Sequence, residues 1–220
     1  MKKVFYAIVL TAGVLNAEQE EIKLSGLYLG GGINFNQDMA KITLAQKYQN
    51  IAEGTKIFGM NDFSYGVHGL VGYNHVFSNK LSLGIEQQVG VATLSDSKMN
   101  SYINGREYED DSRILKPWEF TTLARFGYAF ESFPGIIYIS GGIKVLRTYN
   151  DDGGKNIVRP MFGIGYQHAF WKNWSLRGDV TYTHVSSVNF RSKDEDRNEY
   201  VNCKGKGHRI SASISLVYTF

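Results

Sequence analysis

Arg209-Ile210-Ser211-Ala212-Ser213-Ile214-Ser215-Leu216-Val217-Tyr218-Thr219-Phe220 is the stretch that decides the fold. Successive side chains of a β-strand point to opposite faces, so alternate residues share one face. One face carries Ile210, Ala212, Ile214, Leu216, Tyr218 and Phe220. The other carries Arg209, three serines and Thr219, with Val217 as its single apolar member. Because a slip of one residue would exchange the two faces, the pattern predicts a strand with a fixed apolar side and a fixed polar side.

Seven further segments repeat this two-residue period. They span residues 24–36, 63–77, 81–94, 118–130, 136–149, 157–170 and 174–185. Short polar turns join some of them, and connections expected near 37–62, 95–117 and 186–208 join others. An even number of antiparallel strands, with short turns at one end and long loops at the other, is typical of a transmembrane β-barrel. We therefore predict an all-β, eight-stranded, up-and-down barrel.

Aromatic residues near the ends of these segments indicate which face meets lipid. Tyr128, Phe170 and Trp174 lie at the short-turn ends, whereas Phe63 and Tyr182 lie at the long-loop ends. Two aromatic belts around a band of aliphatic residues fit the two interfaces of a bilayer. A soluble, lipocalin-like barrel is the alternative, but it gives no reason for the belts. The apolar face is therefore expected to point outward.

The N-terminus and the charge balance indicate an exported protein. Lys2 and Lys3 precede an apolar run, and residues 1–17 have the pattern of a cleaved secretory signal peptide, which leaves 18–220 as the barrel. Loss of those two lysines lowers the 24 basic residues to 22, against 21 acidic ones. This near balance argues against nucleic-acid binding. The single cysteine, Cys203, cannot form an internal disulfide and is expected as a free thiol in a loop.

Charged residues also fall on the face that is expected to point into the barrel. An eight-stranded barrel is filled by its side chains, and a charge buried without a partner costs several kcal/mol. The acids and bases should therefore pair into a structural plug. Its predicted members are Glu86, Glu119, Asp179, Arg125, Lys144, Arg159 and Arg177. A gated ion path through the same groups, and hence a small ion channel, is the alternative.

Three stretches carry a resemblance to a known family. Residues 25–32 (SGLYLGGG), 174–183 (WSLRGDVTYT) and 213–220 (SISLVYTF) are similar to the first, penultimate and closing strands of the small OmpA-like, opacity-type outer-membrane β-barrels. The resemblance implies an eight-stranded barrel in the bacterial outer membrane with exposed loops. Members of this family serve as adhesins, serum-resistance factors or structural proteins. The closing strand also resembles the signal that the outer-membrane assembly machinery recognises, and its expected residues are Ile214, Leu216, Tyr218 and Phe220.

An enzymatic alternative rests on the sequence His184-Val185-Ser186. It is similar to the His-x-Ser of the lipid A 3-O-deacylases, which implies Ser186 as nucleophile and His184 as base, with Glu195 or Glu199 as the orienting acid. The bland interpretation is a polar cap where a strand leaves the membrane. The five histidines show no clustered metal-ligand spacing, so we expect neither a metal nor a cofactor.

These observations favour a non-enzymatic outer-membrane surface protein with a structural or adhesive role. Its expected partners are outer-membrane lipid and lipopolysaccharide, the assembly machinery, and host surface or matrix proteins. The deacylase and the ion channel remain as alternatives.

Overall fold

The computed structural model describes residues 22–45, 52, 54, 56–92, 99–103, 106–110, 118–130, 132–150, 153–194 and 199–220. Ten strands lie within these ranges: β1 (Gly26–Leu44), β2 (Lys56–Val76), β3 (Leu81–Ala92), β4 (Met99–Ile103), β5 (Arg106–Asp110), β6 (Trp118–Ala129), β7 (Gly135–Asn150), β8 (Gly153–Ala169), β9 (Trp174–Asp194) and β10 (Glu199–Thr219). Within the described part of the chain, no helix is long and apolar enough to cross a bilayer.

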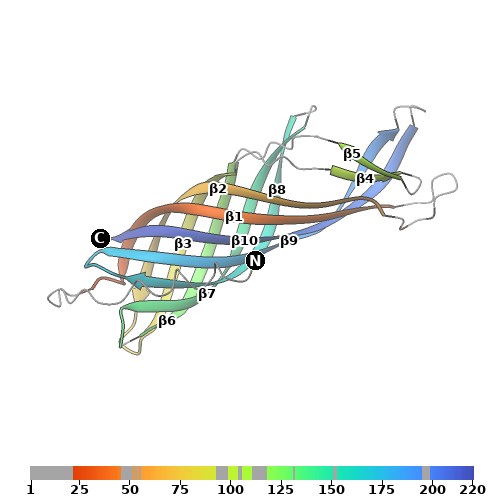
Figure 1. The fold of residues 1–220 in the computed structure, drawn as a ribbon. Coiled ribbons are helices and arrows are strands. Elements are labelled where there is room, and N and C mark those ends of the chain that lie inside the picture. Colours follow the sequence, from red (N-terminus) through yellow and green to blue (C-terminus); the bar gives the residue numbers. More distant parts are fainter. Residues whose placement is uncertain are drawn as a thin grey trace.

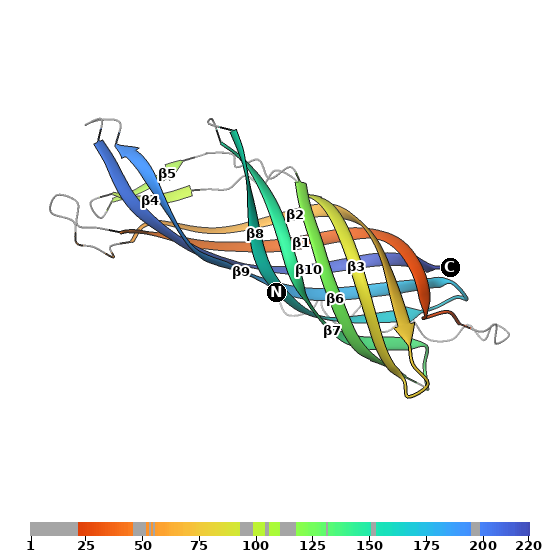
Figure 2. The same cartoon turned by 180° about the vertical axis from the view of Figure 1, so that it is seen from behind.

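Eight of these strands form a closed antiparallel barrel (Figures 1 and 2). Their order around the wall is β1-β10-β9-β8-β7-β6-β3-β2, and pairing of β2 with β1 closes the cylinder. β4 and β5 pair with each other as a separate hairpin, which joins β2 at the pair Phe58 and Ser101. The predicted eight-stranded, up-and-down barrel is therefore confirmed.

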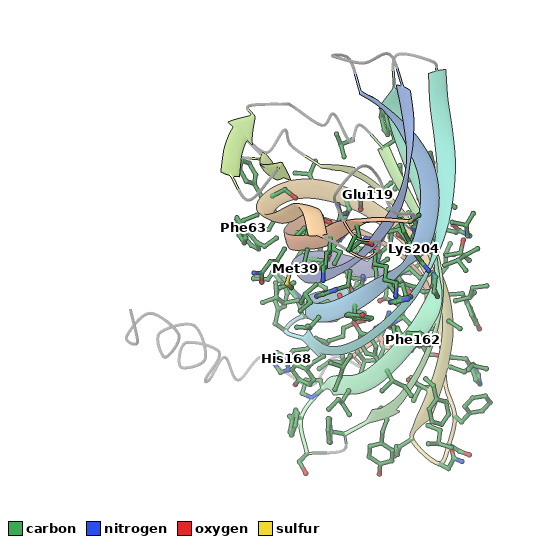
Figure 3. All side chains as sticks on the ribbon, turned by 90° about the vertical axis from the view of Figure 1, so that its right-hand side faces the viewer. Met39, Phe63, Glu119, Phe162, His168 and Lys204 are labelled. Carbon is green, nitrogen blue, oxygen red and sulfur yellow. The ribbon has the colours of Figure 1, made fainter. Side chains whose placement is uncertain are left out.

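The barrel has a polar interior and an apolar outer wall. Along β6, buried and exposed side chains alternate, with Glu119 and Arg125 buried and Phe120 and Phe126 about half exposed. Phe63 and Phe162 are each 63% exposed, and Figure 3 shows them on the outside of the ribbon. Large apolar side chains that lie open on every face of a wall need lipid around them, because water would be a poor solvent for so much apolar surface. The outward direction predicted for the apolar face is confirmed.

Aromatic side chains form a contacting belt at the short-turn end of the barrel. The rings of Trp174 and Tyr218 lie 5.0 Å apart between centroids, and Tyr218 lies 5.1 Å from Phe220. Phe130 and Phe133 stack at 4.7 Å on the turn between β6 and β7. Such rings favour the interface between headgroups and acyl chains. The belt therefore marks one membrane boundary.

Backbone hydrogen bonds fasten the C-terminal residue into the same end of the barrel. The Phe220 amide donates to the Leu27 carbonyl at 2.9 Å, and the Thr219 amide donates to the Asn173 carbonyl at 2.8 Å. Lys80, at the turn between β2 and β3, has a positive φ of 70°. The four residues proposed as an assembly signal lie on the outer face of β10, where the apolar positions alternate with the buried Ser215 and Val217.

Four strands continue well beyond the apolar band. β1 extends to Leu44 and β2 begins at Lys56, while β9 extends to Asp194 and β10 begins at Glu199. The expected loops at 37–62 and 186–208 are thus mostly strand, and Cys203 lies in β10 opposite Leu44 rather than in a loop. Within the expected loop at 95–117, β4 and β5 are strands and the remaining residues lie outside the described ranges.

The extended strands escaped the sequence pattern for a physical reason. The two-residue hydrophobic period of this barrel comes from lipid against one face of each strand, and it is lost where both faces of a strand meet water. The backbone ladder nevertheless continues, since β1 and β10 stay paired as far as Leu44 and Cys203. β8 and β9 separate earlier, after the pair Met161 and Thr183, so the β7–β8 and β9–β10 hairpins diverge (Figures 1 and 2).

Candidate functional site

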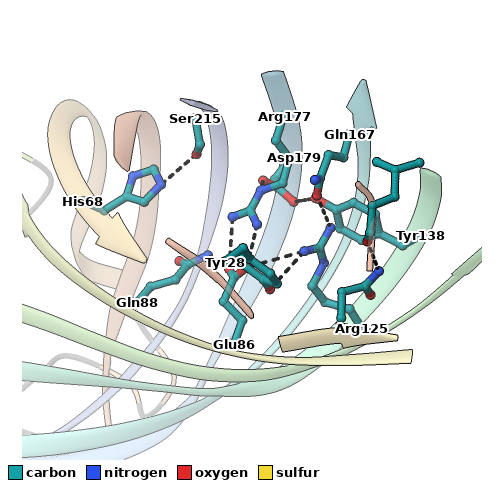
Figure 4. A network of polar contacts seen from close by, with 12 residues as sticks. Tyr28, His68, Glu86, Gln88, Arg125, Tyr138, Gln167, Arg177, Asp179 and Ser215 are labelled. Atoms are coloured by element: carbon teal, nitrogen blue, oxygen red, sulfur yellow. Dashed lines mark hydrogen bonds and ion pairs between the residues drawn. The ribbon is translucent and has the colours of Figure 1, made fainter. Parts of the chain in front are cut away.

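The part of the barrel interior nearer the short-turn end, called the lower layer below, holds a charged network centred on Glu86 (Figure 4). Arg177 donates from Nη1 to Glu86 Oε2 at 2.5 Å and from Nη2 to Oε1 at 3.0 Å. The Tyr28 hydroxyl donates to Oε2 at 2.6 Å, and Gln88 Nε2 donates to Oε1 at 2.7 Å. Arg125 Nη1 lies 3.5 Å from Oε2. A carboxylate held by a bidentate guanidinium and two further donors is fixed in one position.

Arg125 and Asp179 complete this lower network. Arg177 Nε donates to Asp179 Oδ2 at 3.0 Å, and the Tyr138 hydroxyl donates to Asp179 Oδ1. The Arg125 guanidinium lies 3.7 Å from the centroid of the Tyr138 ring, a cation–π contact, and its Nη2 donates to Gln167 Oε1 at 3.3 Å. Two acids and two arginines share this layer, so its formal charge is zero.

A second charged layer lies nearer the long-strand end. Lys144 Nζ donates to Glu119 Oε2 at 3.1 Å, and Arg209 Nη1 donates to Glu119 Oε1. Arg209 also grips Asp38, with Nε to Oδ1 at 2.7 Å and Nη2 to Oδ2 at 2.9 Å. Two acids again face two bases in this layer. Arg159, also buried, lies on β8 directly opposite Lys144.

The structure thus places six of the seven predicted interior residues in two layers, and the seventh, Arg159, is buried opposite Lys144. Glu86, Arg125, Arg177 and Asp179 meet in the lower layer, and Glu119 and Lys144 meet in the upper layer. Sequence reasoning missed Asp38, because it placed residue 38 in a loop, and it did not include Arg209 among the ion pairs. The alternation of inward and outward residues could have found Asp38. It lies two residues beyond the buried Asn36, and β1 continues through it, so both side chains share the inward face.

A small cavity of ≈ 40 Å³ lies between the two layers. Its wall includes Glu86 and Asp179 from the lower layer and Glu119 and Lys144 from the upper layer. Among the described residues, three that line the cavity have a buried atom without a hydrogen-bond partner: Asn34 Oδ1, Arg125 Nε and Ser211 Oγ. Space for a water needs roughly 10–15 Å³. The cavity therefore suits a few waters, which could serve as partners for such atoms.

The residues of the enzymatic alternative are described only in part. His184 is exposed on β9 and is paired with His208 of β10. Its ring stacks with that of Tyr182, with 6.4 Å between the centroids. One residue of β10 opposes two of β9 here, so Ser186 lies in a bulge and the alternation that would align it with His184 is interrupted. The side chain of Ser186 and the whole of Glu195 lie outside the described part.

Glu199 is too far away to serve as the orienting acid. It pairs with Asp194 on β9, about ten residues beyond His184, which corresponds to roughly 33 Å of strand. The strand register therefore gives no support to Glu199 as the acid that orients His184. Among the described residues, no group of three histidines, cysteines or acids is arranged to hold a metal ion.

Comparisons with known proteins agree with this architecture. Residues 5–220 match the family model described as "Outer membrane protein beta-barrel domain". The outer membrane protein OprG of Pseudomonas aeruginosa is similar in structure, with a TM-score of 0.58, 13% identity, and coverage of 90% of this chain and 97% of that chain. AlkL, solved in DMPC bilayers, aligns with a TM-score of 0.53, 14% identity and coverage of 94% and 97%.

The outer membrane protease OmpT of Escherichia coli aligns with a TM-score of 0.49 and 9% identity, covering 92% of this chain and 99% of that chain, a likeness too low to bear on fold or activity. At these identities OprG and AlkL speak for the fold alone. No curated protein matches the chain significantly in sequence. Because the family model covers nearly the whole chain, this protein belongs to the outer membrane protein beta-barrel domain family and lies in the bacterial outer membrane.

Proposed function

We propose that this protein is a non-enzymatic surface protein that acts by contact, through the four strands that continue outside the membrane. The observation that carries the proposal is the length of β9 and β10. Tyr182 is the last exposed large aromatic side chain among those described on β9, and the strand continues to Asp194. Those twelve residues correspond to roughly 40 Å of strand. A pore or an interior enzyme has no need of so long a projection, but a protein that reaches toward another surface does.

The interior supports a structural role for the barrel itself. The two acids and two arginines of the lower layer balance in formal charge, and Arg177 and Glu86 are each 1% exposed. An ion that crosses the barrel would have to displace groups that hold each other by charge-assisted hydrogen bonds. We therefore propose that the barrel is plugged, with the layers serving stability rather than conduction.

The proposed partners follow from where the projection lies. Host surface or matrix proteins would meet the tips of β1, β2, β9 and β10, which extend farthest from the membrane. Lipopolysaccharide would meet the sides of the same strands. The assembly machinery would meet the outer face of β10, through Ile214, Leu216, Tyr218 and Phe220.

The decisive experiment shortens the projection at a point where the register allows it. Val188 and Gly205 are paired, so residues 189–204 can be replaced by an Asn-Gly turn. A matched control joins the paired Leu146 and Ile157 by the same turn and shortens the β7–β8 hairpin instead. Cells that display each variant are assayed for binding to host cells, matrix proteins and complement proteins.

We expect the β9–β10 truncation to lower binding to the level of cells without the protein, and the β7–β8 truncation to leave most of it. Heat-dependent gel mobility shows whether each barrel has folded. Full binding by a folded β9–β10 truncation would reject the contact role. Altered acylation of lipid A in cells that express the wild type would reject the non-enzymatic assignment.

A further inference from the structure

Three exposed lysines form a patch on the outer wall just beyond the apolar band. They are Lys41 on β1 and Lys204 and Lys206 on β10. The two strands pair here without a register shift, so that Lys206 lies directly opposite Lys41 and Lys204 lies opposite Thr43. Directly opposed residues of an antiparallel pair point to the same face. The three ammonium groups therefore project together from the outer surface of the barrel.

Among the described residues, no acid is paired with these lysines. On their other sides, Lys41 is paired with Gly59 of β2 and Lys204 with Asn189 of β9. Asp38, the acid nearest in sequence to Lys41, points inward and holds Arg209. Among the described side chains, none forms a hydrogen bond or ion pair with the three ammonium groups. Like charges placed directly opposite destabilise a strand pair, so the arrangement favours an anion from outside the chain.

The depth of the patch places it at the level of lipid headgroups. Toward the long-strand end, Ile210 is the last large apolar side chain described on the outer face of β10, and Lys206 lies four residues farther along in that direction. Four residues of a strand tilted by about 40° rise roughly 10 Å. His208 lies between them, and its ring is 5.9 Å from that of Tyr182. A lysine at this height can bend its chain back toward the interface.

We propose that Lys41, Lys204 and Lys206 bind a phosphate of lipid A in the outer leaflet. The patch faces sideways from the barrel wall, directly above the apolar band, where the nearest molecules are lipids. A phosphate offers several oxygens to several ammonium donors and would relieve the repulsion between Lys41 and Lys206. The site fixes a lipid headgroup to the seam between β1 and β10, the pair that joins the first and last strands of the barrel.

The test compares lipid binding by the wild-type protein and two double variants in bicelles. The first variant, Lys41→Gln with Lys206→Gln, removes the opposed pair. The control, Lys23→Gln with Lys172→Gln, removes two exposed lysines at the opposite rim. Each protein is titrated with diphosphorylated lipid A, with dephosphorylated lipid A and with inorganic phosphate, and heat-dependent gel mobility verifies folding.

We expect the wild type and the control to bind diphosphorylated lipid A equally and to prefer it over the dephosphorylated form. The Lys41/Lys206 variant should bind it about tenfold more weakly or worse, given that each interfacial lysine contributes appreciably to binding of an anionic surface. Equal binding by a folded Lys41/Lys206 variant would overturn the proposal. So would equal binding of dephosphorylated lipid A, or binding of inorganic phosphate without binding of lipid A.

Discussion

Replacement of Glu86 by glutamine should destabilise the barrel by about 3–5 kcal/mol, the usual cost of removing one partner of a buried ion pair. Glu86 accepts two hydrogen bonds from Arg177 and balances the charge of Arg125 as well. Glutamine keeps one acceptor oxygen but removes the negative charge, so two buried arginines would face Asp179 alone. Their charge could not reach water, because Arg177 is 1% and Arg125 is 3% exposed.

The assay is denaturant unfolding of the barrel refolded in lipid vesicles, followed by tryptophan fluorescence. A double variant, Glu86→Gln with Arg177→Gln, leaves Asp179 and Arg125 as a neutral pair. Its loss should be smaller than the sum of the two single losses by about 2 kcal/mol, because contacting residues are not additive. Glu109→Gln on β5, outside the barrel wall, is the control and should change stability by less than about 0.5 kcal/mol. If the free energy of unfolding of Glu86→Gln lies within about 1 kcal/mol of the wild-type value, the lower charged layer does not stabilise the barrel.

Three further predictions concern packing, conduction and assembly. Gly142→Ala should cost about 1–3 kcal/mol of unfolding free energy, because its Cβ would lie 2.0 Å from the Thr122 carbonyl oxygen, whereas Gly178→Ala, with nothing within 4 Å, should be nearly neutral in the same titration. Purified wild-type protein should show negligible current in planar bilayers, and large steady ion-selective currents would disprove the plug. Phe220→Ser should lower the amount of folded protein in the outer membrane several-fold while the purified chain still refolds in detergent; unchanged amounts in cells would remove Phe220 from the assembly signal.

The fold was predictable because each strand that crosses the membrane alternates apolar and polar residues. Lipid outside and packed polar groups inside require opposite chemistry at alternate residues, so β6 and β10 show the pattern without any knowledge of their neighbours. The interior position of Glu86 or Arg125 follows from the same parity. Within the apolar band, local sequence therefore determines which side chains point inward. For this reason the fold and most of the inward-facing charged residues could be predicted.

Which acid pairs with which base inside the barrel was harder to predict, because these pairs form only when the sheet closes into a cylinder. Glu86 lies on β3 and Arg177 on β9, which are not neighbours in the sheet and meet only across the interior. Glu119 and Lys144 lie on adjacent strands, but Lys144 is registered with Thr121, so the pair is diagonal. Strand tilt and stagger set such contacts in a closed barrel, and neither quantity is encoded in one strand alone.

The upper layer shows how the two parts of the molecule depend on each other. Asp38 lies on β1 beyond Phe35, the last exposed large apolar side chain described on that strand, and yet it holds Arg209 inside the barrel. The polar continuation of β1 therefore contributes to the plug as well as to the projection. Because Arg209 also binds Glu119, the strand pair that bears the lysine patch is tied on its inner face to the upper charged layer. A rigid seam of this kind, with β1 and β10 paired from Tyr28 to Leu44, gives the projection a fixed base, and it explains how strands without an apolar face can stay ordered outside the bilayer.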